Sequence, residues 1–191
     1  MQQTKKGFTL IELLIVIGII GILAAAVIVV LNPAELLAQA RDGTRLSDID
    51  SVNSAINLYI ASVDDFDLNS GAATGTIATV NVAGAACPFS ATCVTDEDTG
   101  TDGSGWVRVD LDESAGGSPI PVLPKDPTDS TDYYYAYAGS DVTNTFEVNG
   151  RLESERHRGK MTTDGGDKTT CVDYLETTCY YEKGTEPGLD F

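Results

Sequence analysis

Glu12 is the residue whose setting most clearly demands a chemical partner. It lies in an otherwise apolar segment that opens with two lysines and a glycine, in the order Lys5-Lys6-Gly7-Phe8-Thr9-Leu10-Ile11-Glu12. A carboxylate inside a membrane helix costs roughly 2.5–3.5 kcal/mol, so such residues pair with an opposite charge or a hydrogen-bond donor. A cut between Gly7 and Phe8 would create an amine one helical turn from Glu12. That amine, on the same subunit or a neighbouring one, would compensate the buried acid.

The four cysteines are the second set of reactive side chains. Cys87 and Cys93 have five residues between them, and Cys171 and Cys179 have seven. An even number of cysteines in an exported, loop-rich domain indicates disulfides. Three connectivities are formally possible, and we expect pairing by proximity. A zinc site is the alternative, but the spacings are not those of zinc motifs and the chain has one histidine.

An acidic, glycine-containing run extends from Asp96 to Gly103. The carboxylates of Asp96, Asp98 and Asp102 could supply oxygen ligands to calcium. The run lacks the twelve-residue EF-hand pattern and has no glutamate at the closing position. A solvated acidic loop is therefore the main interpretation: we expect no cofactor, and calcium stays open as the alternative.

The sequence outside these segments shows no catalytic constellation. The single histidine, His157, lies in a charged run, and neither a phosphate-binding glycine loop nor a Gly-x-Ser-x-Gly elbow is present. The formal charge is −17, and removal of Met1–Gly7 would leave 10 basic residues (12 − 2) against 29 acidic ones, a charge of −19. Such a surface repels nucleic acid. We therefore expect neither an enzyme nor a direct nucleic-acid partner.

The element that must position Glu12 is a long N-terminal helix. From Leu13 to Leu31 no side chain is charged or strongly polar, which approaches the ~20 residues needed to span a bilayer. The lysines precede the apolar run, and this order favours a cytoplasmic N-terminus. The competing interpretation is a secretory signal cleaved after Ala26, although the apolar run continues from Val27 to Leu31 beyond that cut.

A second helical stretch is predicted after Pro33, which should either kink the first helix or begin a new one. Between Ala34 and about Val63, apolar residues recur every three or four positions and form one stripe, made of Leu46, Ile49, Val52, Ile56, Tyr59 and Val63. The charged residues of this stretch, from Arg41 to Asp50, fall largely off the stripe. The stripe needs a partner, most simply a sheet formed by the rest of the chain.

The remaining sequence favours short strands joined by loops. Strands are expected at 76–82, at 106–112, at 133–138 and from Phe146 to Glu153. The region 155–191 is polar and is expected to form loops tied by the second cysteine pair. The predicted fold class is therefore α+β, with a long N-terminal helix packed on a small antiparallel sheet.

The run from Gly7 to Glu12 resembles the class III signal of type IV pilins and pseudopilins. This resemblance implies that a prepilin peptidase cleaves after Gly7, that the new N-terminal Phe8 is methylated, and that Glu12 guides subunit assembly. A second and less specific resemblance covers Leu123–Pro127, the following Tyr-x-Tyr and the strand ending in Leu-Glu. These features are similar to the second half of major pseudopilins of type II secretion, some of which bind calcium through ligands that do not map onto this chain residue by residue.

The resemblance also implies how the chain is divided: a leader at 1–7, a transmembrane and filament-core helix at 8–31, the amphipathic half of the helix at 32–63, a globular β head at 64–154, and a loop-rich, disulfide-tied region at 155–191. Its implied function is that of a structural subunit of a type IV pilus or pilus-like filament. The partners would be a prepilin peptidase, other pilin subunits, an assembly platform with its motor, and the membrane.

The implied location is the cytoplasmic membrane for the precursor, with a single pass and the head outside, and then an extracellular or periplasmic filament. Two alternatives stay open. The first is a type II secretion or DNA-uptake pseudopilin or a minor pilin. The second is a secreted, disulfide-bonded binding protein cleaved after Ala26.

Overall fold

The structure is a computed structural model, and it describes residues 7–70, 75–169, 171 and 178–188. The chain divides into two compact units, Met1–Leu37 and Ala38–Phe191. Of the leader predicted at 1–7, residues 1–6 lie outside the described residues.

The first unit is built on one apolar helix, α1 (Leu10–Leu31). The helix begins after Thr9, which has an extended backbone, and ends before Asn32, whose φ of 40° lies in the left-handed region. Pro33 then takes the first position of the next helix, where its missing N–H is not needed. Of the two outcomes predicted for this proline, the structure shows the new helix.

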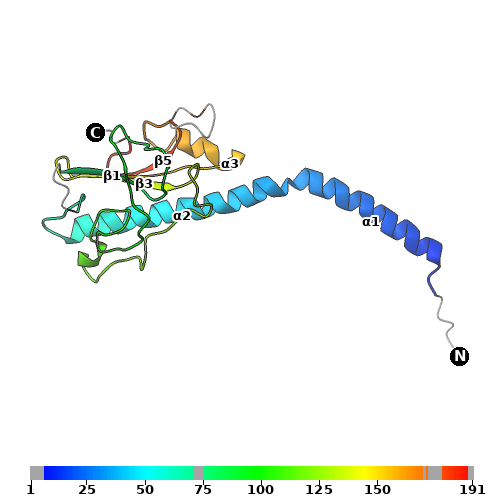
Figure 1. The fold of residues 1–191 in the computed structure, drawn as a ribbon. Coiled ribbons are helices and arrows are strands. Elements are labelled where there is room, and N and C mark those ends of the chain that lie inside the picture. Colours follow the sequence, from blue (N-terminus) through cyan, green and yellow to red (C-terminus); the bar gives the residue numbers. More distant parts are fainter. Residues whose placement is uncertain (1–6, 71–74, 170, 172–177, 189–191) are drawn as a thin grey trace. The chain divides into compact units, whose positions relative to one another are not determined.

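The second unit contains most of α2 (Pro33–Ser62), which lies along one face of a five-stranded sheet (Figure 1). The sheet order is β2-β1-β3-β4-β5, and the strands are β1 (Thr76–Val80), β2 (Val94–Thr95), β3 (Tyr135–Ser140), β4 (Thr145–Gly150) and β5 (Tyr181–Gly184). Neighbouring strands are antiparallel except β1 and β2, which run parallel. The predicted α+β class, with its long N-terminal helix and small, mainly antiparallel sheet, is confirmed.

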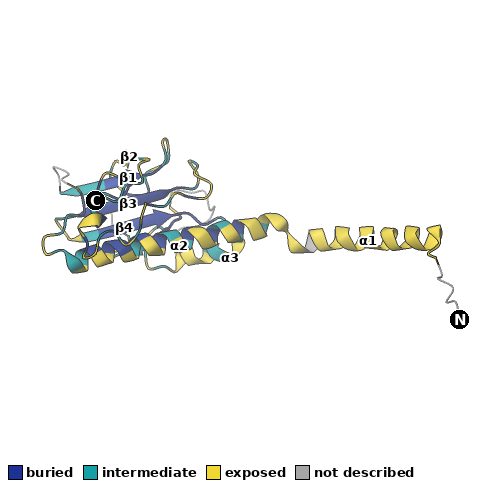
Figure 2. Cartoon of the chain, turned by 90° about the horizontal axis from the view of Figure 1, so that it is seen from below, coloured by how far each residue is buried: buried dark blue, intermediate teal, exposed yellow. Residues whose placement is uncertain are grey.

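The apolar stripe of α2 forms the main core with the sheet (Figure 2). Its central residues, Ile49, Val52, Ile56 and Tyr59, are each at most 1% exposed. They pack with inward-facing residues of β3 and β4, which are Tyr135, Tyr137, Phe146 and Val148. Burial of each aliphatic side chain of this size contributes about 1.5–3 kcal/mol relative to exposure. The predicted pairing of this stripe with a sheet is confirmed.

A smaller core lies on the opposite face of the sheet. Side chains alternate along a strand, so Tyr134, Ala136 and Ala138 point away from α2. They gather with Ala78, Val80, Phe89 and Tyr180, and the half-buried Cys87 and Cys93 pack against this cluster. The loop between β1 and β2 therefore covers part of the second face.

The prediction of a strand at 106–112 is wrong. Trp106 and Val107 are adjacent, yet both are fully buried, whereas a strand would send them to opposite faces. The backbone N–H of Trp106 bonds to the carbonyl of Asp98, and the segment ends in a 3-10 helix at Leu111–Glu113. The segment is an irregular, apolar lining of the main core, so its alternation did not mark a strand.

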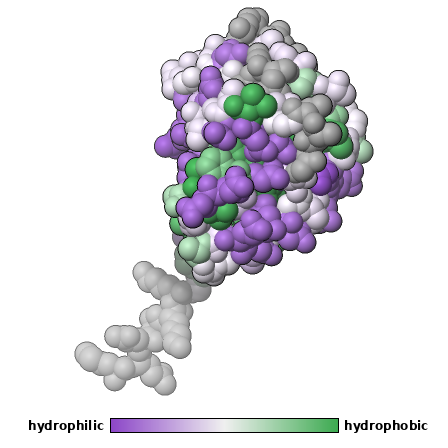
Figure 3. Space-filling model, turned by 90° about the vertical axis from the view of Figure 1, so that its left-hand side faces the viewer, coloured by the Kyte–Doolittle hydropathy of each residue, from purple (hydrophilic) through white to green (hydrophobic). Residues whose placement is uncertain are grey.

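The region 155–191, for which the sequence predicted loops, contributes the sheet edge strand β5, paired with β4. It also contains a short helix, α3 (Glu155–Arg158), and a 3-10 helix at Gly159–Thr162. One face of the second unit is largely polar: in Figure 3 hydrophilic residues cover most of it, and hydrophobic ones form smaller patches. This agrees with the net charge of −17.

Candidate processing and assembly site

The Gly7–Phe8 bond lies in an exposed segment just before α1. Neither residue is helical, and the Phe8 side chain is 84% exposed. A Cβ added to Gly7 would meet no atom within 4 Å. A peptide bond that lies outside a helix and is uncovered by its own chain is accessible to a protease, as the predicted cleavage requires.

Glu12 forms a reciprocal cap with Thr9 at the start of α1. The Thr9 backbone N–H and hydroxyl donate to Glu12 Oε2 at 2.9 and 2.7 Å, and the Glu12 backbone N–H donates to Thr9 Oγ1 at 3.3 Å. The Thr-x-x-Glu spacing is the sequence signature of this capping box, so the cap could have been predicted from these residues. The carboxylate is thus held at the positive end of the helix, close to where the Phe8 amine would form.

The surface of α1 has no cover within the described chain. Its large apolar side chains are about half exposed or more, for example Leu10 at 82% and Ile22 at 73%. The window Leu10–Ile28 is long and apolar enough to cross a membrane. An apolar surface of this extent requires lipid or other protein chains to cover it.

The carboxylates predicted as calcium ligands are engaged in holding their own loop. Asp96 pairs with Arg108. Asp98 Oδ1 accepts from the Gly100 N–H at 3.0 Å, and Asp102 Oδ1 accepts from the N–H and hydroxyl of Ser104. Those bonds from Ser104 lower the pKa of Asp102. Within the described residues, no three His, Cys, Asp or Glu side chains are grouped as a metal site would require.

The cysteines form two disulfides in the structure, Cys87–Cys93 and Cys171–Cys179, with Cα atoms 5.4 and 4.9 Å apart. The first closes the loop over the second face of the sheet. Cys179 is fully buried and belongs to the main core, one residue before the tyrosine pair that leads into β5. The first bridge therefore fastens a loop beside the sheet, and the second ties Cys171 to a residue two positions before β5.

Arg45 of α2 is the centre of a buried ionic cluster that was not predicted from the sequence. Its Nε and Nη2 donate to the two oxygens of Asp126 at 2.6 and 2.9 Å, and its Nη1 donates to Asp42 and Glu153 at 2.9 and 2.8 Å. A fifth bond reaches Thr128 Oγ1 at 2.9 Å, so the guanidinium uses all five N–H groups. Burial opposes the charge, but hydrogen bonds and attraction from Asp126, then from Glu153 and Asp42, raise the pKa of Arg45.

The expectation that the charged residues of α2 lie off its buried stripe is wrong for Asp42 and Arg45. Both are fully buried. They lie seven and four residues before Ile49, so they continue the same three-and-four spacing and face the sheet side. The spacing alone could have placed them there, but only the fold shows that carboxylates from other segments neutralise the arginine.

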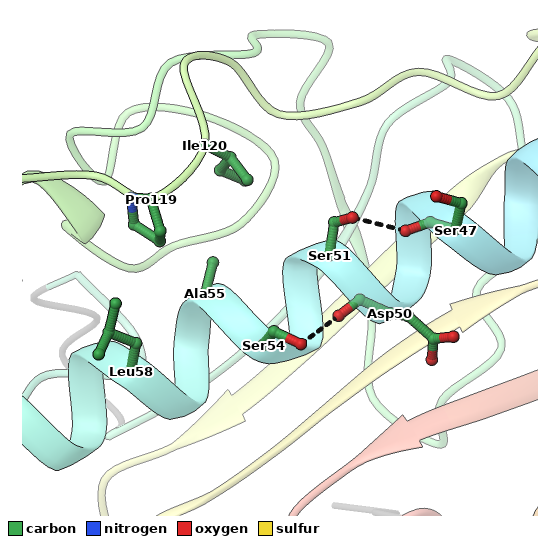
Figure 4. A pocket seen from close by; sticks show the side chains of 8 residues that line it. All are labelled: Ser47, Asp50, Ser51, Ser54, Ala55, Leu58, Pro119 and Ile120. Carbon is green, nitrogen blue, oxygen red and sulfur yellow. Dashed lines mark hydrogen bonds between the residues drawn. The ribbon is translucent and has the colours of Figure 1, made fainter.

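The outer face of α2 carries an open groove of about 660 Å³ beside Pro119 and Ile120 (Figure 4). Its helical lining is rich in small polar side chains. The hydroxyls of Ser51 and Ser54 donate back to the helix carbonyls of Ser47 and Asp50, each at 2.7 Å. These bonds engage the Ser51 and Ser54 hydroxyls within the helix itself.

The start of the chain matches the prokaryotic N-terminal methylation motif over residues 3–28. Over 69 residues the chain is 45% identical to a type IV major fimbrial protein FimA of Dichelobacter nodosus, which covers 36% of this chain and 43% of that protein. Over 58 residues it is 50% identical to another FimA and to a fimbrial protein of the same organism, covering 30% of this chain and 36% of each relative. No solved structure is significantly similar to the chain.

The N-terminal motif, the α+β fold and these relatives make the chain similar to type IV pilins. The similar proteins with curated names are fimbrial proteins, mostly major ones. The chain spans less than half the length of these relatives: the match covers 43% of the first FimA and 36% of the second.

Proposed function

We propose that this chain is the precursor of a structural subunit of a type IV pilus or pilus-like filament. The observation that carries the proposal is the capping-box carboxylate of Glu12 at the head of an apolar helix that its own chain leaves exposed. A lone carboxylate there is costly in a membrane or filament core unless a cation joins it. Cleavage before Phe8 supplies such a cation.

In this proposal residues 1–7 are a cytoplasmic leader and 8–31 span the membrane. A prepilin peptidase cleaves after Gly7 and Phe8 is methylated. An assembly platform and motor then move the subunit into a filament, where helices 8–31 bundle and Glu12 meets the Phe8 amine of a neighbouring subunit. The amphipathic half at 32–63, the head at 64–154 and the tied region at 155–191 face outward, in an extracellular or periplasmic location.

The role proposed is mechanical, without catalysis or a resident cofactor. The relatives named as fimbrial proteins favour a pilus subunit over the two alternatives. A type II secretion or DNA-uptake pseudopilin would use the same N-terminal chemistry, so the filament from which the subunit is recovered separates it from a pilus subunit. A secreted protein cleaved after Ala26 would lose Glu12 altogether.

The proposal is tested first by the intact mass and N-terminal sequence of the mature protein from its native membrane or filament fraction. We expect a chain that begins at Phe8 and is heavier by one methyl group. The variant Gly7→Leu should retain the leader, because a large side chain at the cut would block the peptidase. A mature chain beginning at Val27 would contradict the proposal.

Replacement of Glu12 by glutamine is expected to lower filament yield at least about tenfold while leaving cleavage largely intact. Glutamine can also complete a capping box, so the helix start is retained and only the charge is lost. Hydrogen bonds to charged groups contribute about 1.5–3 kcal/mol, and each 1.4 kcal/mol is a factor of ten in association. The yield is measured by quantitative immunoblot of sheared filaments against the membrane pool.

The matched control is Thr9→Ala, which removes the hydroxyl partner of Glu12 but keeps the carboxylate. This variant should assemble at close to the normal yield. If Thr9→Ala fails as severely as Glu12→Gln, the cap itself carries the effect and pairing with the amine does not.

A further inference from the structure

Three fully buried polar side chains meet on the face of the sheet that points away from α2. In β4, Phe146 and Val148 belong to the main core, so Glu147 and Asn149 point to the opposite face. In β5, Tyr181 belongs to the main core, so Glu182 also points away from α2. Asn149 lies directly opposite Glu182 in the register of the two strands. We call this set the β4–β5 polar patch: Glu147, Asn149 and Glu182, exposed by 1%, 0% and 0%.

The patch contains oxygen and nitrogen atoms that the described part of the chain leaves without hydrogen-bond partners. They are both polar atoms of the Asn149 carboxamide and Oε1 of Glu182. Each unsatisfied buried polar group costs about 1–3 kcal/mol, and nearly all such groups in folded proteins find a partner. Two of these three atoms, Asn149 Oδ1 and Glu182 Oε1, are oxygen acceptors, and their lack of a partner indicates a missing ligand.

The loop from Asp164 to Lys168 encloses Glu182 and adds negative charge. The Glu182 backbone N–H donates to Asp164 Oδ2 at 2.8 Å, and Glu182 Oε2 accepts from the Lys168 backbone N–H at 3.0 Å. A Cβ on Gly166 would lie 1.8 Å from that same oxygen, so the loop approaches closely only because this residue is glycine. Burial, then the charge of Glu147, and then Asp164 and Asp167 raise the pKa of Glu182 to about 8.

We propose that the β4–β5 polar patch binds one calcium ion, with Glu147, Asn149 and Glu182 as its side-chain ligands. All three offer oxygen, which suits a hard cation. Calcium accepts six to eight oxygens in flexible geometry, so water and backbone carbonyls complete the shell. Magnesium demands a near-ideal octahedron, and zinc prefers nitrogen or sulfur.

This site is distinct from the acidic run at 96–102. There the aspartates bond to neighbouring donors of their own loop, whereas here Asn149 Oδ1 and Glu182 Oε1 lack partners. Glu147 Oε2 accepts from the Gly188 backbone N–H at 2.6 Å. The patch provides two carboxylates and one carboxamide, which is consistent with finding no group of three acidic or other ligating residues among the described residues. Calcium bound here would join two strands, and therefore the C-terminal strand β5 to the body of the sheet.

The test uses the full chain in detergent micelles at pH 8, where the carboxyl of Glu182 can release its proton to the metal. Calorimetric titration with calcium chloride should show one site with a dissociation constant in the range of about 0.1–1 mM, typical of extracellular modules. Thermal unfolding in 5 mM calcium chloride should occur about 4–8 °C higher than in EDTA. Trp106, the only tryptophan, reports on the main core.

Two variants decide the assignment. Glu182→Gln should fold, because glutamine is an isostere of the protonated acid, and should lose the calcium-dependent shift and at least about tenfold in affinity. Asp98→Asn should keep both. The absence of a calcium-dependent rise in the unfolding temperature of the unaltered protein would overturn the proposal. So would an equal shift in Glu182→Gln, which indicates diffuse binding to an acidic surface, or loss of the shift in Asp98→Asn alone, which would assign calcium to the acidic run.

Discussion

Replacement of Arg45 by methionine is expected to lower the free energy of unfolding of the second unit by about 3–5 kcal/mol. The side chain is fully buried and donates five hydrogen bonds. Methionine fills much of the same volume but leaves the carboxylates of Asp42, Asp126 and Glu153 without the guanidinium that joins them. Of these three carboxylates, Arg41 bonds to that of Glu153. Uncompensated carboxylates in a dry interior cost far more than a lost surface ion pair.

The cluster also explains why the loss should unfold the unit as a whole. Asp42 accepts from the backbone N–H groups of Glu153 and Ser154 at 3.0 and 2.8 Å, so the same network holds the segment after β4 against α2. Asp126 lies in the proline-rich segment Leu123–Pro127. Arg45 therefore joins three segments that are far apart in the chain.

The measurement is denaturant unfolding of the full chain in micelles, followed by Trp106 fluorescence. The matched control is Arg108→Met, the same exchange at a partly exposed pair with Asp96, where the expected loss is at most about 1 kcal/mol. Equal losses for the two variants would show that Arg45 stabilises the unit no more than a surface arginine does.

The second large effect concerns pH. In the absence of calcium, the protein should lose stability as the pH rises from about 5 to 8, by up to about 1.4 kcal/mol per pH unit from Glu182. The pKa of this carboxyl is raised from 4.5 to about 8 in the folded state, first by burial and then by Glu147. The folded state therefore keeps a proton that the unfolded state releases. The stabilising contribution is full below pH 4.5 and is lost through pH 8.

Glu182→Gln should remove this dependence, because glutamine carries no titrating proton. The variant should match the unaltered protein near pH 5 and exceed its stability at pH 8 in EDTA. Urea unfolding at half-unit pH intervals measures the difference. Parallel pH profiles for the two proteins would show that Glu182 does not titrate in this range.

The sequence alone determined the features that depend on neighbouring residues. The order of lysines, glycine, phenylalanine and glutamate, and the apolar run to Leu31, identified the N-terminal helix and its relation to pilins. The spacing of Ile49, Val52, Ile56 and Tyr59 indicated which face of α2 is buried. Helix periodicity and proline chemistry act within a few residues, so the break before Pro33 could also be predicted.

Only the tertiary structure decided which charges are buried and which strands meet. Arg45 is stable inside the unit because Asp126 and Glu153, distant in the chain, neutralise it. Trp106 and Val107 could alternate as a strand does, yet both are buried in the core, and the Trp106 backbone N–H bonds to the loop carbonyl of Asp98. Glu147, Asn149 and Glu182 become one patch through the register of β4 and β5. These outcomes depend on contacts between segments far apart in sequence, and no local pattern encodes them.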